Sequence, residues 1–350
     1  MNKNLRLISQ AVMMAAAVCT LVACGDKKEE KQAVAEQPAT PAKAIVLKLG
    51  YENHPGEPFD QGCNKWKELL EQRSGGALKI ELYPSSQLGS KGDIIDSMIL
   101  GENVATLADG AFYADRGVKD FGIMFGPFFF DSYEEAFKLA KSPWFKDQEK
   151  KLEEQGLVIA GANWKYGDRN TLTVKPVRKM EDFHGLKVRV ATNEIFSEGM
   201  RTLGVTPTPM PLGDVYTSLQ QGTIDGVENP VSVLYGGKFQ EVAKYLLMDA
   251  HIRNITNIVV GAKFMAKLTP EQQQMIKDTC AEAGEYQNKI VDEQEQSFLE
   301  KMKEAGVEII YPDEEFKAQM HKAAASFYEL PQFTKIWSPD LYKTVKENCK

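Results

Sequence analysis

The sequence contains few of the residues and motifs on which most enzymes and metal sites depend. It has four histidines and five cysteines in 350 residues, and the histidines are scattered rather than clustered as a metal site requires. It contains no Gly-x-Ser-x-Gly elbow, no Walker loop, no His-Glu-x-x-His motif and no Cys-x-x-Cys motif. These absences predict a protein that is not an enzyme and needs no metal or cofactor. A carboxylate pair that meets in space, such as Glu52 with Asp109, remains compatible with acid–base chemistry.

Long hydrophobic runs are also scarce, and the one at the N-terminus is short. Lys3 and Arg6 precede an apolar core over residues 11–23, which falls short of the roughly 20 residues that span a bilayer. The run ends in Leu-Val-Ala-Cys, which resembles the lipobox of bacterial lipoproteins. We expect a signal peptide over residues 1–23, cleaved before a lipid-modified Cys24, with a transmembrane anchor as the less favoured alternative.

Residues 24–43 contain almost no large apolar side chains. They consist mainly of Asp, Lys, Glu, Gln, Pro and Ala, and Val34 is the exception. Such a segment buries too little apolar surface to order itself, so we expect a flexible tether.

Acidic residues outnumber basic residues in this sequence. Loss of two basic residues with the signal leaves 40 basic and 49 acidic residues, a net charge of −9. This balance argues against a nucleic-acid partner. An anionic ligand would need fixed positive charge within its own site.

Three cysteines remain after Cys19 leaves with the signal and Cys24 takes lipid. An exported protein folds in an oxidising compartment, where Cys63, Cys280 and Cys349 permit one disulfide with one thiol left over. All three are equally compatible with small buried apolar groups. The sequence does not choose between a disulfide and free buried thiols.

Strand-like and helical segments alternate from residue 45 onward. The helical pattern over residues 59–73 ends at Gly75 and Gly76, and a shorter one ends at Gly101. This alternation predicts an α/β protein, and a chain of about 300 residues is large enough for two lobes. The expected strands are 45–49, 78–83, 104–108, 157–160, 172–174, 186–190 and 255–260.

One helical segment is unusually long. Residues 271–305 contain no proline, and Thr269 with Gln272 forms a capping-box pattern before them. At 1.5 Å per residue this helix would extend about 50 Å, so we expect it to lie across both lobes. Two helices that break near Gly284 are the alternative.

Ordered motifs over most of the chain resemble one known family. Gly-Leu-Lys-Val-Arg-Val at residues 185–190 is followed by Asp-Gly-Val-Glu-Asn-Pro at residues 225–230. Together with the motifs at 83–89, 203–210, 214–216, 219–222, 238–242 and 244–246, these are similar to the DctP family of TRAP transporter solute-binding proteins over residues 45–310.

This resemblance implies the two-lobed periplasmic-binding-protein fold, with a hinge and a long helix spanning both lobes. We expect lobe I over residues 44–166, lobe II over 167–254, and a return to lobe I over 255–350 that includes the helix 271–305 and C-terminal helices.

The family's carboxylate-binding residues fall on three positions of this sequence. Arg189 matches the arginine that grips the substrate carboxylate, for which a planar guanidinium offers two parallel donors. An exposed strand arginine paired with Asp182 or Glu194 is the alternative. Arg169 matches a second arginine, which either lies close to the ligand or braces the site. Asn229 matches an asparagine that bonds the same carboxylate, although asparagine is also common in turns.

Four further positions are weaker matches. Asp109 aligns with a position that contacts substrate hydroxyls and Glu52 with a first-loop contact, and both are alternatively solvated loop residues. Leu212 stands where some sialic-acid binders have phenylalanine, which argues against sialic acid. Trp164, with Tyr166 beside it, is expected on the cleft wall, with core packing as the alternative.

The resemblance implies an extracytoplasmic subunit that delivers a small organic acid to a small and a large integral membrane subunit, driven by an ion gradient. We expect it in the periplasm, anchored through Cys24 to the outer face of the cytoplasmic membrane. The polar groups favour a sugar acid such as a uronate or keto-gulonate over a four-carbon dicarboxylate. A binding protein of an ATP-driven importer or a sensor, a secreted hydrolase or lyase, and a structural lipoprotein are competing interpretations of the same sequence.

Overall fold

The computed structural model describes residues 44–350. The predicted signal peptide, the predicted lipidation site at Cys24 and the predicted tether lie outside the described residues.

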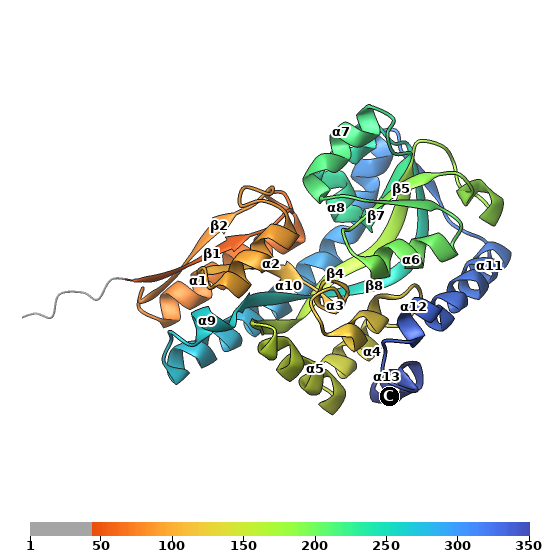
Figure 1. The fold of residues 1–350 in the computed structure, drawn as a ribbon. Helices are drawn as coiled ribbons and strands as arrows, with labels where there is room; N and C mark the ends of the chain where they lie inside the picture. The colour runs from red at the N-terminus through yellow and green to blue at the C-terminus, as the bar shows by residue number, and fades with distance from the viewer. Residues whose placement is uncertain (1–43) are drawn as a thin grey trace, which may run out of the picture. The chain divides into compact units, whose positions relative to one another are not determined.

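A nine-stranded mixed sheet runs through this part of the chain (Figure 1). Its strand order is β2-β1-β3-β8-β4-β7-β5-β6, and β9 pairs with β8. The predicted α/β class is confirmed. The strands are β1 Ile45–Gly50, β2 Leu78–Tyr83, β3 Val104–Ala108, β4 Leu157–Thr173, β5 Lys187–Val190, β6 Thr206–Pro209, β7 Gly226–Pro230, β8 Tyr245–Gly261 and β9 Glu308–Ile310.

Thirteen α-helices accompany the sheet within residues 44–350. They are α1 Pro58–Arg73, α2 Lys91–Leu100, α3 Gly110–Ala114, α4 Tyr133–Ala140, α5 Pro143–Glu154, α6 Glu194–Thr202, α7 Val215–Gln220, α8 Val231–Gly236, α9 Ala262–Met265, α10 Pro270–Glu304, α11 Glu314–Ala325, α12 Pro331–Thr334 and α13 Leu341–Asn348.

Two long antiparallel strands join the two halves of the sheet. β1 pairs in parallel with β2 and β3 in one half, and β5 pairs in parallel with β6 and β7 in the other. β4 and β8 pair with each other between these halves, with register shifts between Ile159 and Thr171. The lobe limits expected at residues 166/167 and 254/255 fall inside β4 and β8, and they stay a prediction.

The sequence pattern missed the full length of these two strands. The expected strands 157–160 and 172–174 are the two ends of β4, and 255–260 is the last part of β8. The missed stretch of β4 has the sequence Gly-Ala-Asn-Trp-Lys-Tyr-Gly-Asp-Arg-Asn-Thr, which lacks the apolar runs of a buried strand. Its polar groups have partners elsewhere in the fold. Lys165 bonds to Asn288 and Asp292 of α10. Arg169 bonds to Glu228 and Asn254 beside the cavity described below.

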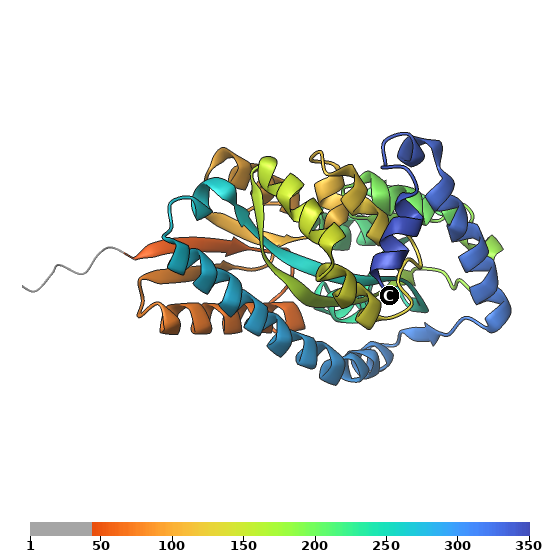
Figure 2. The same ribbon diagram turned by 90° about the horizontal axis from the view of Figure 1, so that it is seen from below.

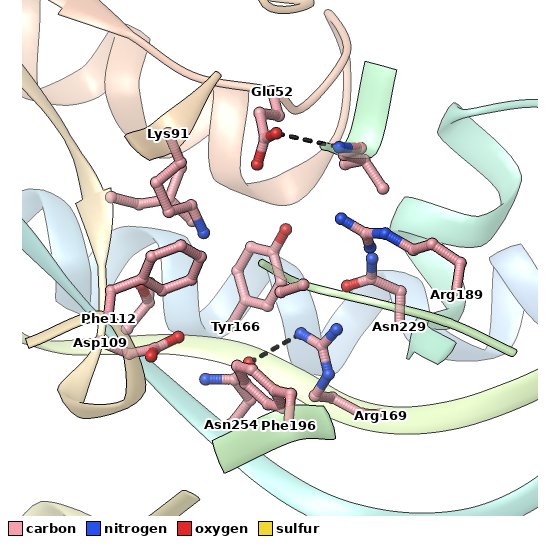
Figure 3. Close-up of a pocket in the computed structure, with 14 residues that line it drawn as sticks. Glu52, Lys91, Asp109, Phe112, Tyr166, Arg169, Arg189, Phe196, Asn229 and Asn254 are labelled. Carbon is pink, nitrogen blue, oxygen red and sulfur yellow. Dashed lines mark hydrogen bonds between the residues drawn. The ribbon is translucent and has the colours of Figure 1, made fainter. Parts of the chain in front are cut away.

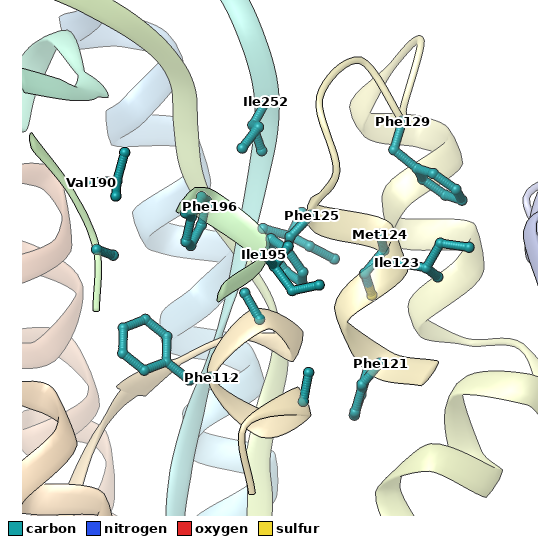
Figure 4. Close-up of a cluster of buried hydrophobic side chains, with 14 of the residues drawn as sticks. Phe112, Phe121, Ile123, Met124, Phe125, Phe129, Val190, Ile195, Phe196 and Ile252 are labelled. Carbon is teal, nitrogen blue, oxygen red and sulfur yellow. The ribbon is translucent and has the colours of Figure 1, made fainter. Parts of the chain in front are cut away.

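Buried apolar side chains form two clusters on opposite faces of the sheet. Val104 and Ala108 of β3 belong to one cluster, whereas Ala105 and Leu107 belong to the other, as the alternation of side chains along a strand requires. Each cluster takes side chains from both halves of the sheet. Figure 4 shows part of the first cluster, including Phe112 and Phe196, two residues that also reach the cavity.

The predicted long helix is one continuous element. α10 begins within one residue of the expected start, and its Thr269–Gln272 capping box is formed. It lies beside α1 and β4 and reaches α8, as Figure 2 shows in part. Gly284 does not break it. A Cβ there would lie 2.8 Å from Cδ1 of Trp164, so the glycine makes room for the indole. The two-helix alternative is wrong.

The three cysteines of the described part are buried and free. Cys63, Cys280 and Cys349 form no disulfide, so they match the expectation of small buried groups. Among residues 44–350, no helix combines the length and the hydropathy that a membrane span requires.

Candidate ligand-binding site

A polar cavity lies where the two halves of the sheet meet, at the carboxyl ends of the parallel strands. Glu52 follows β1, Asp109 follows β3, Ala191 follows β5, and Asn229 is next to last in β7. Parallel strands of α/β proteins place ligand sites at this edge. The lining residues, most of which are labelled in Figure 3, are Glu52, Lys91, Leu107, Asp109, Phe112, Tyr166, Arg169, Arg189, Ala191, Phe196, Leu212, Asn229, Asn254 and Thr256.

Six of the seven candidate binding residues line this one cavity. They come from segments far apart in the sequence, and the fold brings them together: Glu52, Asp109, Arg169, Arg189, Leu212 and Asn229. The seventh, Trp164, is fully buried elsewhere, and its indole nitrogen donates to the carbonyl of Cys280 at 3.2 Å. Its expected place on the cleft wall is wrong, because Gly62 and Gly284 leave room for the ring against α1 and α10. Tyr166 lines the wall instead.

Arg189 presents an unpaired guanidinium to the cavity. The side chain is only 3% exposed, and its Nε donates to the carbonyl of Met210 at 2.9 Å. This bond orients the guanidinium plane, and neither Nη atom has a hydrogen bond or an ion pair within residues 44–350. The alternative pairing with Asp182 or Glu194 is absent there. Burial lowers the pKa of Arg189, although Glu52 and Glu228 act in the other direction. Two outward-facing donors on a buried cation suit a carboxylate.

Asn229 lies beside Arg189 on the neighbouring strand. Its side chain is 3% exposed, and its Oδ1 is buried without a hydrogen-bond partner among the described residues. Buried polar atoms are rarely left unsatisfied in native proteins. The side-chain amide of Asn229 can therefore still form a hydrogen bond in the cavity, next to the Nη atoms of Arg189 (Figure 3).

Arg169 is held by protein groups on nearly all sides. Its guanidinium forms a two-point ion pair with Glu228, in which Nη2 donates to Oε1 at 2.7 Å. Nη1 donates to Oδ1 of Asn254 at 3.1 Å, and the guanidinium lies 4.8 Å from the ring centre of Phe196. Of the two roles expected for Arg169, this geometry favours bracing the site.

A buried chain of charges continues behind Arg169. Nε2 of His251 lies 3.3 Å from Glu228, and its Nδ1 lies 3.1 Å from Asp249. Burial acts to lower the pKa of His251, but the two carboxylates outweigh it and raise this pKa to about 9. Burial acts to raise the pKa of Glu228, but Arg169 and His251 outweigh it and lower this pKa to about 2. The sequence analysis assigned no role to Glu228 or His251.

Glu52 links the two halves across the cavity. Its Oε1 accepts a hydrogen bond from the main-chain nitrogen of Leu212 at 3.0 Å. Glu52 follows β1 in one half, whereas Leu212 follows β6 in the other. The contribution of Leu212 therefore includes its main chain, which no side-chain motif reveals.

Asp109 and Lys91 occupy the side of the cavity away from Arg189 (Figure 3). Asp109 caps α3, and its Oδ1 accepts from the nitrogen of Ala111 at 3.1 Å. Burial raises the pKa of Asp109, although Lys91 and Arg169 oppose this. The sequence analysis missed Lys91. Its position in the first turn of α2 was a usable signal, because the helix dipole disfavours a cation there.

The chain matches known proteins over most of its length. The model of the family described as "Bacterial extracellular solute-binding protein, family 7" matches residues 49–335. The 2,3-diketo-L-gulonate-binding periplasmic protein YiaO of Escherichia coli (strain K12) is 32% identical over 268 residues, covering 76% of this chain and 81% of YiaO. The C4-dicarboxylate-binding periplasmic protein DctP of Rhodobacter capsulatus is 31% identical over 265 residues, covering 76% of this chain and 79% of that protein.

A solved structure has the same fold. The TRAP periplasmic solute-binding protein of Ochrobacterium anthropi, crystallised with bound L-fuconate, is 43% identical with a TM-score of 0.84, covering 88% of this chain and all of that chain. The predicted two-lobed fold with a long helix is thereby confirmed.

Proposed function

Because the chain belongs to bacterial extracellular solute-binding protein family 7, we propose that its cavity binds a sugar acid whose carboxylate contacts Arg189 and Asn229. The observation that carries this proposal is the buried guanidinium of Arg189, whose two Nη atoms have no partner among residues 44–350. The names of two relatives, one binding 2,3-diketo-L-gulonate and one crystallised with L-fuconate, support the choice of a sugar acid.

Proteins of this family are periplasmic subunits that bind small organic acids and work with the membrane components of TRAP transporters. For this chain we propose delivery to a small and a large integral subunit, driven by an ion gradient. The solute would be carried unchanged, without catalysis.

Closure of two lobes around the solute completes the proposed mechanism. With lobe I at residues 44–166 and 255–350, and lobe II at 167–254, Glu52 belongs to the first and Leu212 to the second. The hydrogen bond between them would then form only when the lobes are closed. Closure excludes water, which strengthens the attraction between Arg189 and a carboxylate. Hinge closure of this kind is a common response of periplasmic binding proteins to ligand.

A four-carbon dicarboxylate is the second candidate. The ammonium of Lys91 favours it, because Lys91 is a further cation that lines the cavity besides Arg189 and Arg169. One relative is named for binding such acids. The carboxylates of Asp109 and Glu52 on either side of Lys91 argue against a second ligand carboxylate.

A thermal-unfolding screen separates these functions. Ligand at 100 times its Kd stabilises a protein by about 2.7 kcal/mol, a shift that is readily measured. We expect L-fuconate or L-galactonate to raise the unfolding temperature, and chromatography to recover the acid unchanged. Stabilisation by succinate and not by any sugar acid would refute the proposal, and conversion of the acid would favour an enzyme.

Attachment of lipid to Cys24 is a separate proposal, which rests on the sequence pattern at residues 21–24. Mass spectrometry of the mature protein from a bacterial membrane fraction should find a diacylglyceryl group on this cysteine. A mature N-terminus without lipid contradicts the proposal and leaves the binding function untouched.

A further inference from the structure

Glu57 is a buried acid that lies outside the ligand cavity. It is the N-cap residue of α1 and is 3% exposed. Its Oε1 accepts a hydrogen bond from the main-chain nitrogen of His54 at 2.8 Å, and its Oε2 accepts one from Nδ2 of Asn53 at 2.7 Å. No Lys, Arg or His side chain of residues 44–350 forms an ion pair with it within 4.0 Å. A buried carboxylate without a cationic partner is unfavourable, and binding a proton removes its charge.

The main chain of α8 covers Glu57 from the opposite side. A Cβ on Gly236 of α8 would overlap Oε1 of Glu57, so the glycine allows the helix backbone to lie directly against the carboxyl group. Both residues line one groove, which α10 completes. With the lobes as proposed, Glu57 belongs to lobe I and Gly236 to lobe II. Opening of the lobes would separate α8 from Glu57 and admit water to the carboxyl group, whereas closure would bury it.

The surroundings of Glu57 favour its neutral form. Burial, helped by Asp60 of α1, raises the pKa of Glu57 to about 8, although the hydrogen bonds from Asn53 and His54 oppose this. Separation from α8 would remove much of the burial, so this pKa should then return toward its ordinary value of 4.5. The other ionisable side chains that face Glu57 or its groove come from the segment after β1, from β4, from α10, and from η4 Phe239–Glu241 with the residue before it: Tyr51, His54, Tyr166, Lys301, Glu241 and Lys238.

A hydrogen-bonded chain connects Glu57 to the ligand cavity. Nδ2 of Asn53, which donates to Glu57, also donates to the hydroxyl oxygen of Tyr166 at 3.0 Å, and the side chain of Tyr166 lines the cavity. Oδ1 of Asn53 lies 3.4 Å from the same hydroxyl. Reversal of the Asn53 amide would let its Oδ1 accept the proton of a neutral Glu57 while its Nδ2 donates to Tyr166. Asn53 can therefore satisfy both protonation states of Glu57, and the hydrogen bonding of Tyr166 differs between them.

We propose that Glu57 takes up a proton from the solvent when the lobes close on a solute, so that capture of the solute is coupled to proton uptake. This inference rests on the proposed function, because it requires closure around a ligand. The step is an acid–base reaction in which one carboxylate and one proton form a carboxylic acid. Glu57 does not line the ligand cavity, so it acts through closure of the lobes and not as a binding residue.

Coupling of this kind makes the affinity depend on pH in a defined direction. Glu57 is protonated below about pH 8 in the closed form, and below about pH 4.5 in an open form with the ordinary pKa. Proton binding therefore favours closure fully at low pH, and this contribution is lost as pH rises through 8. Between about pH 6 and about pH 7.5, the Kd for L-galactonate should rise about 5-fold to 10-fold for each unit of pH.

Calorimetry at about pH 7 in phosphate and in Tris counts the protons, because the two buffers have different ionisation enthalpies. The test variant is Glu57→Gln, which keeps the shape of the side chain but cannot ionise. The matched control is Glu241→Gln. Glu241 lines the same groove, is exposed, and accepts a hydrogen bond from the hydroxyl of Tyr216 at 2.7 Å, which a glutamine can also accept. Thermal unfolding of the ligand-free proteins checks their folding.

The wild type and Glu241→Gln should each take up about 0.5–1 proton per molecule of L-galactonate bound at about pH 7. Glu57→Gln should take up at least about 0.5 proton fewer, because the other ionisable groups contribute alike in all three proteins. At about pH 8 it should also bind at least about 10-fold more tightly than the wild type, since its neutral side chain is buried on closure without loss of charge hydration.

Two results would overturn the inference. One is equal proton uptake in the wild type and Glu57→Gln, and the other is an affinity that falls with pH as steeply in Glu57→Gln as in the wild type. If Glu57→Gln does not fold, wild-type binding without proton uptake overturns the inference by itself. Failure of the proposed function looks different, because the wild type would then give no binding heat with L-galactonate at any pH. The same titrations are then made with succinate.

Discussion

Replacement of Arg189 by methionine tests the charge on which the proposed function depends. Methionine keeps much of the length of the side chain but removes both Nη donors and the positive charge. The arginine is 3% exposed, so the contact that we propose with a ligand carboxylate is shielded from water and salt. Loss of one partner from a buried, hydrogen-bonded charge pair costs about 2–5 kcal/mol. This corresponds to a loss of about 30-fold to about 5,000-fold in affinity.

The matched control is Arg201→Met. Arg201 lies in α6, its side chain is 56% exposed, and its ion pair with Glu198 at 3.2 Å is solvated. Such a pair contributes little to stability, so this variant should bind the sugar acid as the wild type does. Isothermal titration calorimetry supplies the Kd for all three proteins, and thermal unfolding of the ligand-free proteins checks their folding.

The ligand-free Arg189→Met protein should be at least as stable as the wild type. Burial lowers the pKa of Arg189, which means that folding disfavours its charged form. A folded Arg189→Met protein with a Kd within about threefold of the wild type, less than about 1 kcal/mol, would refute the assigned role.

Three further predictions concern the charge chain, the long helix and the link across the cavity. The folded-state pKa of His251, about 9, is above its ordinary value of 6.5, so its stabilising effect is full below pH 6.5 and lost as pH rises through 9. Urea unfolding should therefore show that the free energy of unfolding of the wild type falls between about pH 7 and about pH 9.5. The fall should be smaller in His251→Gln. An equal fall in both proteins would contradict this prediction. Gly284→Ala should lower the free energy of unfolding by about 1–3 kcal/mol, because the new Cβ would meet Trp164 at 2.8 Å. Helix propensity alone predicts a gain of about 1 kcal/mol. Such a gain would show that the Trp164 ring moves aside without cost. Glu52→Ala should weaken sugar-acid binding by about 10-fold in calorimetry. Glu52→Gln should weaken it less, because glutamine keeps an acceptor for the main-chain nitrogen of Leu212. Equal losses in the two variants would show that the charge of Glu52, and not its hydrogen bond to Leu212, supports binding.

Local patterns in the sequence were sufficient for several elements. The capping box at Thr269 and the absence of proline through residue 304 predicted α10 to within one residue, because helix ends are governed by groups close in the chain. The glycine stop at Gly101 is likewise observed as a left-handed C-cap of α2. Only parts of the long strands β4 and β8 were predicted, since partner strands far away in the sequence satisfy their backbone groups.

Motif resemblance located most of the residues that line the cavity, but it did not predict which of their charged side chains are ion-paired within the protein. Six candidates meet there. Arg189 was expected to bind a ligand carboxylate, and Arg169 either to lie close to the ligand or to brace the site. The structure separates them, because Arg169 is paired with Glu228 whereas the Nη atoms of Arg189 have no partner among the described residues. A sequence places a charge along the chain but does not state which charge will neutralise it.

The sequence by itself determined the alternation of helices and strands, the long helix and the family, since each of these depends on neighbouring residues or on ordered motifs. The tertiary structure alone decided that Trp164 packs against α10, that Lys91 enters the cavity, and that Glu52 bonds to the main chain of Leu212. These outcomes depend on distances between segments that are far apart in the sequence, and such distances are set by how strands pair and helices pack around the whole sheet.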